Sequence, residues 1–289
     1  MTEPLARVMV CGPESGGWLE ESKFSRWQEL GFLKPPEFQA ARREHLALCH
    51  ALMSAGAEVI SWNPANRDQL SLDAVYVHDA SFMTDEGAIL LSMGKSSRNG
   101  EPAGHKAFYA EQGIPILGTV QPPGKAEGGD LVWLDSRTLL AGIGYRTNLA
   151  GIEQLRKILR PLQVEILPAP LPHGGGPNSC LHLMSLLSVL DEKTALVDLP
   201  WLAVQTVELM QERGFRFIEI NPRERDTLAC NVLSLGDGRL LGFEENRETT
   251  HRLQREGFKV LVVQGRHMGI NGGGGPTCLT RPLLRRAQN

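Results

Sequence analysis

The stretch Arg255-Glu-Gly257-Phe-Lys-Val-Leu261 joins the end of a polar, helix-like run to a short apolar strand. A glycine at this place can take the left-handed backbone conformation that ends many helices, and the aromatic and β-branched residues after it favour a strand. The stretches 54–60, 111–117 and 212–218 have the same design. A fifth stretch, 155–167, has Pro161 in place of the glycine, and we expect this proline to end the helix.

The spacing of these joints predicts the fold. They recur about every 50 residues, and short strands precede the helix in the intervals between them. We expect strands over 74–77, 88–91, 131–134, 138–141, 227–233 and 239–242, and helices over 101–111, 148–159 and 246–256. The unit is therefore ββαβ, repeated five times, and five units arranged radially form a five-bladed α/β propeller with strand ends around a central channel. A plain αβ sandwich with accidental spacing is the alternative.

No stretch between these units has the composition of a linker, so we expect one domain of five modules over residues 1–289. The segment 11–36 is rich in glycine, proline and aromatic residues and has no periodicity. It is either a lid loop over the site or a static surface loop.

Composition narrows the class of protein. The chain has 289 residues, 42% hydrophobic and 22% charged, with a net charge of −3, which suits a large core and not a nucleic-acid-binding surface. Its five cysteines form no CxxC pair, which favours a reduced, intracellular protein. No signal peptide and no run of about 18 apolar residues is present, so we expect a cytoplasmic enzyme without membrane partners.

Four places carry candidate chemistry. Cys278 follows the four glycines 272–275, which let the backbone approach whatever lies beside the thiol; an inert buried cysteine is the alternative. His182 lies in an apolar stretch, where most histidines are core residues. Glu127-Gly-Gly-Asp130 precedes an expected strand, and His78-Asp79 ends another. Strand alternation would put Asp73 and Asp79 on one face.

A metal site is not expected. Cys180 and His173 lie near His182, but no fourth ligand and no paired cysteines complete a zinc site. The carboxylates instead suggest a cationic substrate, since they recognise a guanidinium through paired hydrogen bonds. A positive charge about 4 Å from the thiol contributes roughly 4 kcal/mol at an effective dielectric of 20. That exceeds the ~2 kcal/mol needed to bring the thiol pKa below 7, so the substrate itself would help to ionise the nucleophile.

Seven short motifs, in order, resemble those of one family. They are Asp73-Ala-Val-Tyr-Val-His-Asp79, Ser97-Arg-Asn-Gly-Glu101, Glu127-Gly-Gly-Asp130, Tyr145-Arg-Thr-Asn148, Leu181-His-Leu-Met-Ser185, Cys230-Asn-Val-Leu233 and Gly275-Pro-Thr-Cys278-Leu-Thr280. The chain from Asp73 onward resembles dimethylarginine dimethylaminohydrolases, within the superfamily of arginine deiminases and amidinotransferases. That family has a five-bladed α/β propeller fold, in agreement with the repeat pattern.

The resemblance implies a role for each matching residue. Cys278 would be the nucleophile, His182 the general acid and base, and Glu127 the group that orients His182 and contacts the guanidinium. Asp79 would bind guanidinium nitrogens, Arg98 and Arg146 would clamp a substrate carboxylate, and Asp73 would meet the α-amine. His78 stands where the family commonly has glutamate, so we include it among substrate-binding residues and expect a different N-substituent or guanidino compound to be accepted.

The resemblance further implies hydrolysis of a guanidino compound of the arginine or N-methylated arginine type. A covalent cysteine adduct would lead to a ureido product such as citrulline, with no metal or cofactor. Amidino transfer to an acceptor amine is one alternative, and it would use the same residues. A non-catalytic guanidine-binding protein is a third hypothesis, and the presence of Cys278, His182 and Glu127 argues against it. The partner would be a small guanidino molecule, with a homodimer left open.

Overall fold

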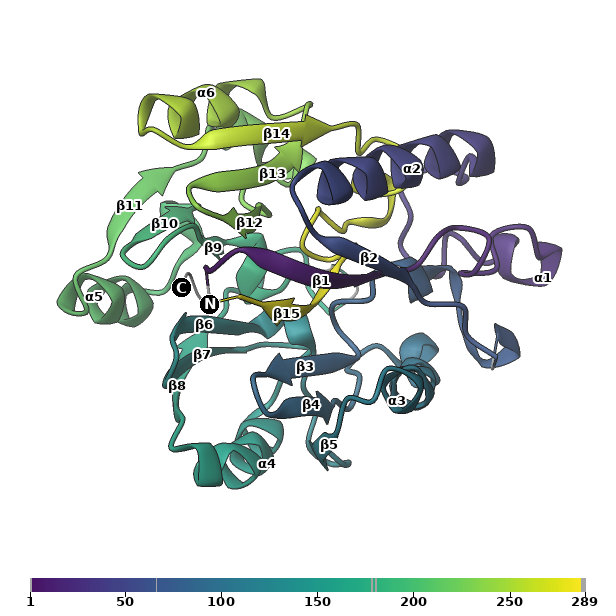
Figure 1. The fold of residues 1–289 in the computed structure, drawn as a ribbon, viewed down its shortest axis with the longest axis horizontal. Helices are drawn as coiled ribbons and strands as arrows, with labels where there is room; N and C mark the ends of the chain where they lie inside the picture. Colours follow the sequence, from purple (N-terminus) through teal and green to yellow (C-terminus); the bar gives the residue numbers. More distant parts are fainter. Residues whose placement is uncertain (1, 66, 178, 180, 287–289) are drawn as a thin grey trace.

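The structure is a computed structural model and describes residues 2–65, 67–177, 179 and 181–286. Five three-stranded sheets are arranged around a centre, with a helix outside each sheet (Figure 1). The five-bladed α/β propeller is therefore confirmed, and the sandwich alternative is wrong.

Each blade is a ββαβ unit whose first two strands pair antiparallel and whose last two pair parallel across a helix. In strand order, with the helix last, the blades are β15 (Arg281–Arg285), β1 (Leu5–Val10), β2 (Glu58–Ser61) and α2 (Phe38–Ser54); β3 (Ser81–Thr84), β4 (Gly87–Leu90), β5 (Ile116–Thr119) and α3 (Glu101–Glu111); β6 (Leu131–Asp135), β7 (Thr138–Ile143), β8 (Glu165–Pro170) and α4 (Leu149–Leu159); β9 (Leu187–Val189), β10 (Thr194–Val197), β11 (Arg216–Glu219) and α5 (Val204–Glu212); and β12 (Leu233–Gly236), β13 (Arg239–Phe243), β14 (Lys259–Val263) and α6 (Arg247–Arg255).

One blade closes the ring with both ends of the chain. Strand β15 pairs antiparallel with β1, with Pro282 opposite Val8. The repeat pattern predicts the five joints but does not predict which strand pairs with residues 281–285. The structure alone therefore shows how the ring closes. It fixes the segment just before β15, which carries Cys278.

The joints have the expected backbone. Four glycines take positive φ angles of 94°, 66°, 81° and 93°; they are Gly56, Gly113, Gly214 and Gly257. A side chain there would meet no atom within 4 Å, so backbone conformation alone demands glycine. At the fifth joint the expectation needs correction: a 3-10 turn, Arg160–Leu162, contains the proline, and Gln163 takes the left-handed conformation, with φ 56°.

Two expected strands are wrong. Residues Leu72–Val75 form a 3-10 turn capped by Ser71, whose hydroxyl accepts from the Asp73 amide, and Pro222–Thr227 form another. Leu72, Ala74 and Val75 are buried on all sides, so the run lacks the alternation that separates a strand from a buried turn. The alternation argument that paired Asp73 with Asp79 therefore fails.

Amphipathic helices cover the outside of the blades. In α4, Ile152, Leu155 and Leu159 are fully buried, and burial of each such side chain contributes about 1.5–3 kcal/mol. The Asn148 side chain accepts from the Gly151 amide at 2.8 Å, and such a cap contributes ~1 kcal/mol. Among the described residues, no helix combines the length and the apolar character needed to cross a bilayer.

Candidate active site

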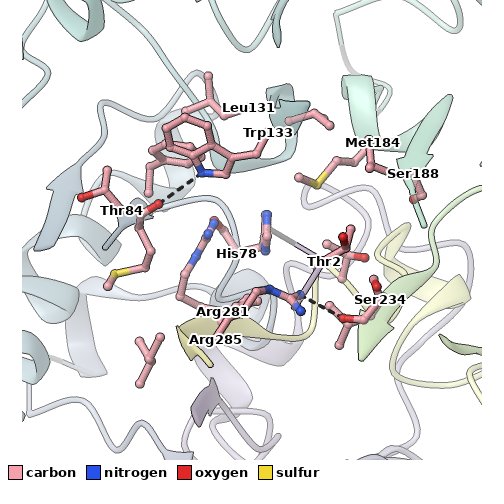
Figure 2. A pocket seen from close by; sticks show the side chains of 18 of the residues that line it. Thr2, His78, Thr84, Leu131, Trp133, Met184, Ser188, Ser234, Arg281 and Arg285 are labelled. Carbon is pink, nitrogen blue, oxygen red and sulfur yellow. Dashed lines mark hydrogen bonds between the residues drawn. The ribbon is translucent and has the colours of Figure 1, made fainter. Parts of the chain in front are cut away.

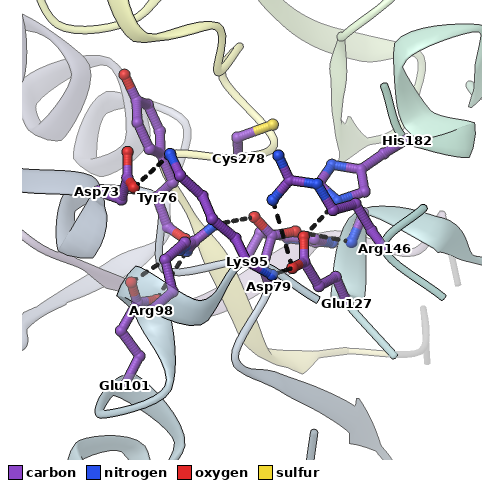
Figure 3. Close-up of polar contacts among 12 residues, drawn as sticks. Asp73, Tyr76, Asp79, Lys95, Arg98, Glu101, Glu127, Arg146, His182 and Cys278 are labelled. Atoms are coloured by element: carbon purple, nitrogen blue, oxygen red, sulfur yellow. Dashed lines mark hydrogen bonds and ion pairs between the residues drawn. The ribbon is translucent and has the colours of Figure 1, made fainter. Parts of the chain in front are cut away.

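The residues with candidate chemistry share one position in the repeat. A short turn precedes the first strand of each blade; these turns carry Asp79 before β3, Glu127 before β6, His182 before β9, Asn231 before β12 and Cys278 before β15. Asp79, His182 and Cys278 line one cavity of about 580 Å³, and Figure 3 shows them facing a common space. Equivalent edges of different blades thus deliver these side chains to one end of the channel.

Glu127 and His182 form a buried pair. The His182 Nε2 lies 2.7 Å from Glu127 Oε2, and the backbone amides of Gly94 and Lys95 donate to Oε1 at 2.8 and 3.0 Å. Burial by itself would raise the pKa of Glu127, but the hydrogen bond and charge of His182 outweigh it and lower the pKa. Glu127 therefore stays ionised and can stabilise an imidazolium at residue 182.

Asp79 is a second ionised carboxylate beside this pair. Its Oδ1 accepts from the Gly129 amide at 2.9 Å and its Oδ2 from Arg98 at 2.6 Å. Burial opposes ionisation, yet the charges of His182 and Arg98 hold the pKa of Asp79 well below its usual range. A side chain at Gly129 would lie 2.7 Å from the His182 ring and 3.0 Å from Asp79, so glycine is what lets the turn fit between them.

The Asp79, Glu127 and His182 side chains come within 4.8 Å of one another. This set could hold a cation. Arg98 already pairs with Asp79, and Arg146 lies 3.6 Å from Glu127, so cationic side chains meet part of that charge. A planar guanidinium, which presents several N–H donors, matches the remaining carboxylate lone pairs better than a small ion does. Cys180, weighed above as a zinc ligand, lies outside the described residues.

Cys278 is held by a residue to which the sequence analysis gave no role. The Asn231 side-chain amide donates to Cys278 Sγ at 3.4 Å, and its oxygen accepts from the Thr277 amide at 3.0 Å. Cys278 is partly exposed to the cavity. The signal that could have found Asn231 is its place in the turn before β12, equivalent to the other four.

Arg98 and Arg146 differ in the number of protein contacts that their guanidinium groups make. Arg98 lines the cavity, but its guanidinium donates four hydrogen bonds to Asp79, Glu101 and the Tyr76 carbonyl. These protein groups take four of its five N–H donors, and a clamp by Arg98 on a substrate carboxylate stays a prediction. Arg146 also lines the cavity, and its guanidinium has the longer, 3.6 Å contact with Glu127.

Asp73 meets a lysine that the sequence gave no reason to select. Lys95 Nζ lies 2.6 Å from Asp73 Oδ2 and donates to the Leu30 carbonyl at 2.6 Å. Asp73 and Lys95 both line the cavity. A substrate amine at Asp73 would share that carboxylate with Lys95.

His78 does not line this cavity, and its expected place among the substrate contacts stays a prediction. Its amide donates to the Cys278 carbonyl, and its Nδ1 lies 2.9 Å from the Thr280 carbonyl. These bonds turn the ring toward β15, where it lines a different cavity. Burial and the charge of Arg281 lower the pKa of His78 to about 3, so the ring is neutral at pH 7.

Part of the segment 11–36 forms a wall of the cavity. Leu30, Gly31 and Leu33 line it, and the segment contains the short helix α1 (Glu21–Phe24). Trp18 is buried and donates to the Leu72 carbonyl at 3.0 Å, which anchors the first half of the segment. Whether the segment moves as a lid stays a prediction.

The family described as arginine deiminase matches residues 71–208 and 199–285, most of the chain. The chain belongs to the arginine deiminase family. It is 30% identical over 86% of its length to an uncharacterized protein of Bacillus subtilis, YkgA, covering 81% of that protein. It is 29% identical over 75% of its length to a dimethylarginine dimethylaminohydrolase of Streptomyces coelicolor, covering 76% of it.

Solved structures agree on the fold of this arginine deiminase family member. A dimethylarginine dimethylaminohydrolase from Pseudomonas aeruginosa, in complex with citrulline, superposes with a TM-score of 0.73, at 22% identity, covering 96% of this chain and 98% of that one. The resemblance to dimethylarginine dimethylaminohydrolases is thereby confirmed, and membership makes the chain an enzyme that hydrolyses guanidino carbon–nitrogen bonds.

Proposed function

We propose that this enzyme hydrolyses the guanidino group of an arginine-type amino acid, with Cys278 as nucleophile. The observation that carries the proposal is the convergence of Asp79, Glu127 and His182 to within 4.8 Å, beside a cavity that Cys278 also lines. Two ionised carboxylates favour a bound cation, and a partly exposed thiol lies where that cation can be attacked.

In the first half of the reaction, the guanidinium binds between Asp79 and Glu127, and its charge favours the Cys278 thiolate. The sulfur attacks the guanidinium carbon, which forms the S–C bond. His182 then gives a proton to the departing nitrogen, the C–N bond breaks, and amine or ammonia leaves. The product of this half is an alkylthiouronium on Cys278, with the amino acid still attached.

In the second half, water replaces the departed amine. His182 takes a proton from the water as its oxygen adds to the same carbon. The C–S bond then breaks and the hydroxyl proton is lost to solvent as the C=O bond forms, which returns the thiolate and releases a ureido amino acid of the citrulline type. Glu127 stabilises the imidazolium each time it forms, since its carboxylate lies 2.7 Å from Nε2.

For the amino-acid end we propose Arg146 as the carboxylate partner and Asp73 as the partner of the α-amine. Arg146 is 6% exposed and lines the cavity, where a second anion can approach it. Asn231 would position the sulfur through its 3.4 Å hydrogen bond. We further propose that residues 1–289 act as one five-module domain and that the protein is cytoplasmic; a homodimer stays a prediction.

The test is incubation of the purified enzyme with arginine, monomethylarginine and dimethylarginine, each with and without an acceptor amine. We expect a ureido product without the acceptor, and the fastest of the three substrates defines the accepted N-substituent. A product only in the presence of the acceptor would indicate amidino transfer. Tight binding without any product would indicate a guanidine-binding protein; either result would overturn the proposal.

A further inference from the structure

A second cavity lies inside the propeller, separate from the catalytic cavity but touching the same turns at His78, Met184 and Thr277. Its volume is about 170 Å³, and the first strands of all five blades, β15, β3, β6, β9 and β12, contribute to its wall. Figure 2 shows the cavity with Arg281, Arg285 and His78 among apolar side chains. The catalytic mechanism uses none of these three.

Arg281 is a buried cation that makes no direct ion pair with any described carboxylate, although the charge of Asp79 acts on it from a greater distance. It is 4% exposed, and its guanidinium donates to the His78 carbonyl, while Nε has no hydrogen-bond partner. Within the part of the chain that the structure describes, no carboxylate lies within 4.0 Å of it. Burial lowers the pKa of Arg281 only to about 10, so the group is charged at neutral pH. A buried charge that is only partly compensated costs folding free energy and favours binding of an anion.

The other polar groups around the cavity leave its charge positive. Arg285 lines the cavity and donates to the carbonyls of Glu3 and Ser234. Asp85 is the carboxylate among the lining residues, and it is exposed on the rim. His78 is neutral, and its Nε2 has no partner.

Most of the remaining wall is apolar and partly aromatic, and hydroxyl side chains interrupt it at Thr2, Thr84, Ser188, Ser234 and Thr277. Trp133 stacks on Phe82, with ring centroids 5.2 Å apart, and both line the cavity together with Leu131. A cavity of about 150 Å³ lined by apolar side chains is large enough for benzene. The volume here therefore suits a single aromatic ring.

We propose that this channel cavity binds a small aromatic carboxylate, whose anion pairs with Arg281 and whose ring packs against Trp133 and Phe82. The site is distinct from the catalytic cavity. Its occupation does not depend on the proposed reaction, so binding can succeed or fail whatever the activity of the enzyme.

The first test uses the wild-type protein and two probes of equal size, benzoate and benzyl alcohol, in isothermal titration calorimetry. We expect saturable binding of benzoate, at least about tenfold tighter than that of benzyl alcohol, because only benzoate carries the charge that Arg281 lacks. Equal affinity for the two probes, or no saturable binding of benzoate, would overturn the proposal without any variant.

A matched pair of variants tests whether Arg281 supplies the positive charge that binds benzoate. Arg281→Met should weaken benzoate binding about tenfold or more, whereas Arg216→Met, which removes an exposed arginine paired with Glu256, should leave it unchanged. If Arg281→Met does not fold, the comparison of probes on the wild type still decides. Unchanged binding by a folded Arg281→Met would overturn the assignment.

The position of the ligand is tested in crystals soaked with 4-bromobenzoate. The anomalous signal of bromine should lie beside Trp133 and Phe82. A peak in the catalytic cavity, near Arg146 or Lys95, would place the anion elsewhere and overturn the proposal. Water alone in the channel cavity would do the same.

Discussion

Arg98 and Arg281 are both 4% exposed, and they contact adjacent residues. Arg98 donates to the Asp79 carboxylate and Arg281 to the His78 carbonyl, so the charges around the two guanidinium groups differ. Arg98 meets two carboxylates, Asp79 and Glu101, whose charges overcome burial and raise its pKa well above the usual value. Arg281 meets a carbonyl, and burial lowers its pKa to about 10.

The difference shows how the propeller divides its charges. At the catalytic end the fold supplies a counter-charge for each buried cation, so that the carboxylates are fixed before a substrate arrives. In the channel cavity Arg281 has no directly paired carboxylate among the described residues, and we propose that a ligand anion takes this place. Changes at the two ends should therefore have separable effects.

The largest expected effect is a loss of turnover that leaves ligand binding in the channel cavity unchanged. Cys278→Ser should lower turnover by at least about a thousandfold, because a serine hydroxyl is far less acidic than a thiol. The same variant should keep the wild-type fold and affinity for benzoate. Turnover and benzoate titration on one preparation check this.

The matched control is Cys49→Ser, a half-buried thiol on α2 that lies 3.5 Å from His45 and outside the catalytic cavity. It should keep full turnover. Substantial activity in Cys278→Ser would remove residue 278 as the nucleophile.

The second effect is on stability. Arg98→Met should lower the free energy of unfolding by about 3–5 kcal/mol, since it leaves Asp79 and Glu101 buried without their cation. Arg281→Met should change it by less than about 1 kcal/mol in the absence of an anion, because the lost hydrogen bond is offset by removal of an unpaired buried charge. Urea denaturation measures both. Equal losses would contradict the contrast between the two arginines.

A third, smaller effect concerns the substrate carboxylate. Arg146→Ala should raise KM about 10- to 100-fold for arginine-type substrates, as expected for loss of one charged hydrogen bond. Agmatine, which has the guanidino group and no carboxylate, is the matched substrate and should show little change. If KM for arginine stays the same, Arg146 does not bind the carboxylate.

The last prediction is a pH dependence of stability at Asp130, on the turn between the two ends. Asp130 is fully buried; its Oδ1 accepts from the Leu183 amide at 2.9 Å, the Thr147 side chain also hydrogen-bonds the carboxyl, and its Oδ2 has no partner among the described residues. Burial raises its pKa to about 6. The folded state therefore binds this proton more tightly than the unfolded state, and stability falls as pH rises from about 4 to 6.

Asp130→Asn keeps the oxygen for Leu183 and removes this titration. The free energy of unfolding of the wild type minus that of the variant should fall by about 2–3 kcal/mol between pH 4 and 7, as the shift in pKa requires. A difference that stays constant over this range would mean that Asp130 titrates normally in the folded protein.

The sequence predicts the architecture well because the joints are local. Residues close together in the sequence decide both the positive φ of a glycine and the strand after it. The joints at Gly56, Gly113, Gly214 and Gly257 could therefore be predicted from the sequence. The closure of β15 on β1 depends on residues at opposite ends of the chain and has no local signal. Buried runs such as Leu72–Val75 misled the strand prediction because apolar residues there face protein on every side.

The site residues also fall into those that a local motif predicts and those that depend on distant partners. Cys278, Glu127, Asp79 and Arg146 lie at the cavity or directly behind it, where motifs in the turns before the inner strands place them. The directions of His78 and Arg98 could not be predicted, because each is decided by a distant partner: the Thr280 carbonyl for His78, and Glu101 together with Asp79 for Arg98. Lys95 has no motif, and only the fold brings it to Asp73.

The most direct measurement of the central claim is the intact mass of His182→Gly after incubation with its substrate. Without the imidazole that activates water, the adduct on Cys278 should accumulate, with a mass gain equal to that of the substrate less the departed amine or ammonia, and peptide mapping should place it on residue 278. A gain of the amidino group alone would indicate transfer chemistry. No added mass with any of the three guanidino substrates, while wild-type enzyme turns one of them over, would contradict the covalent mechanism.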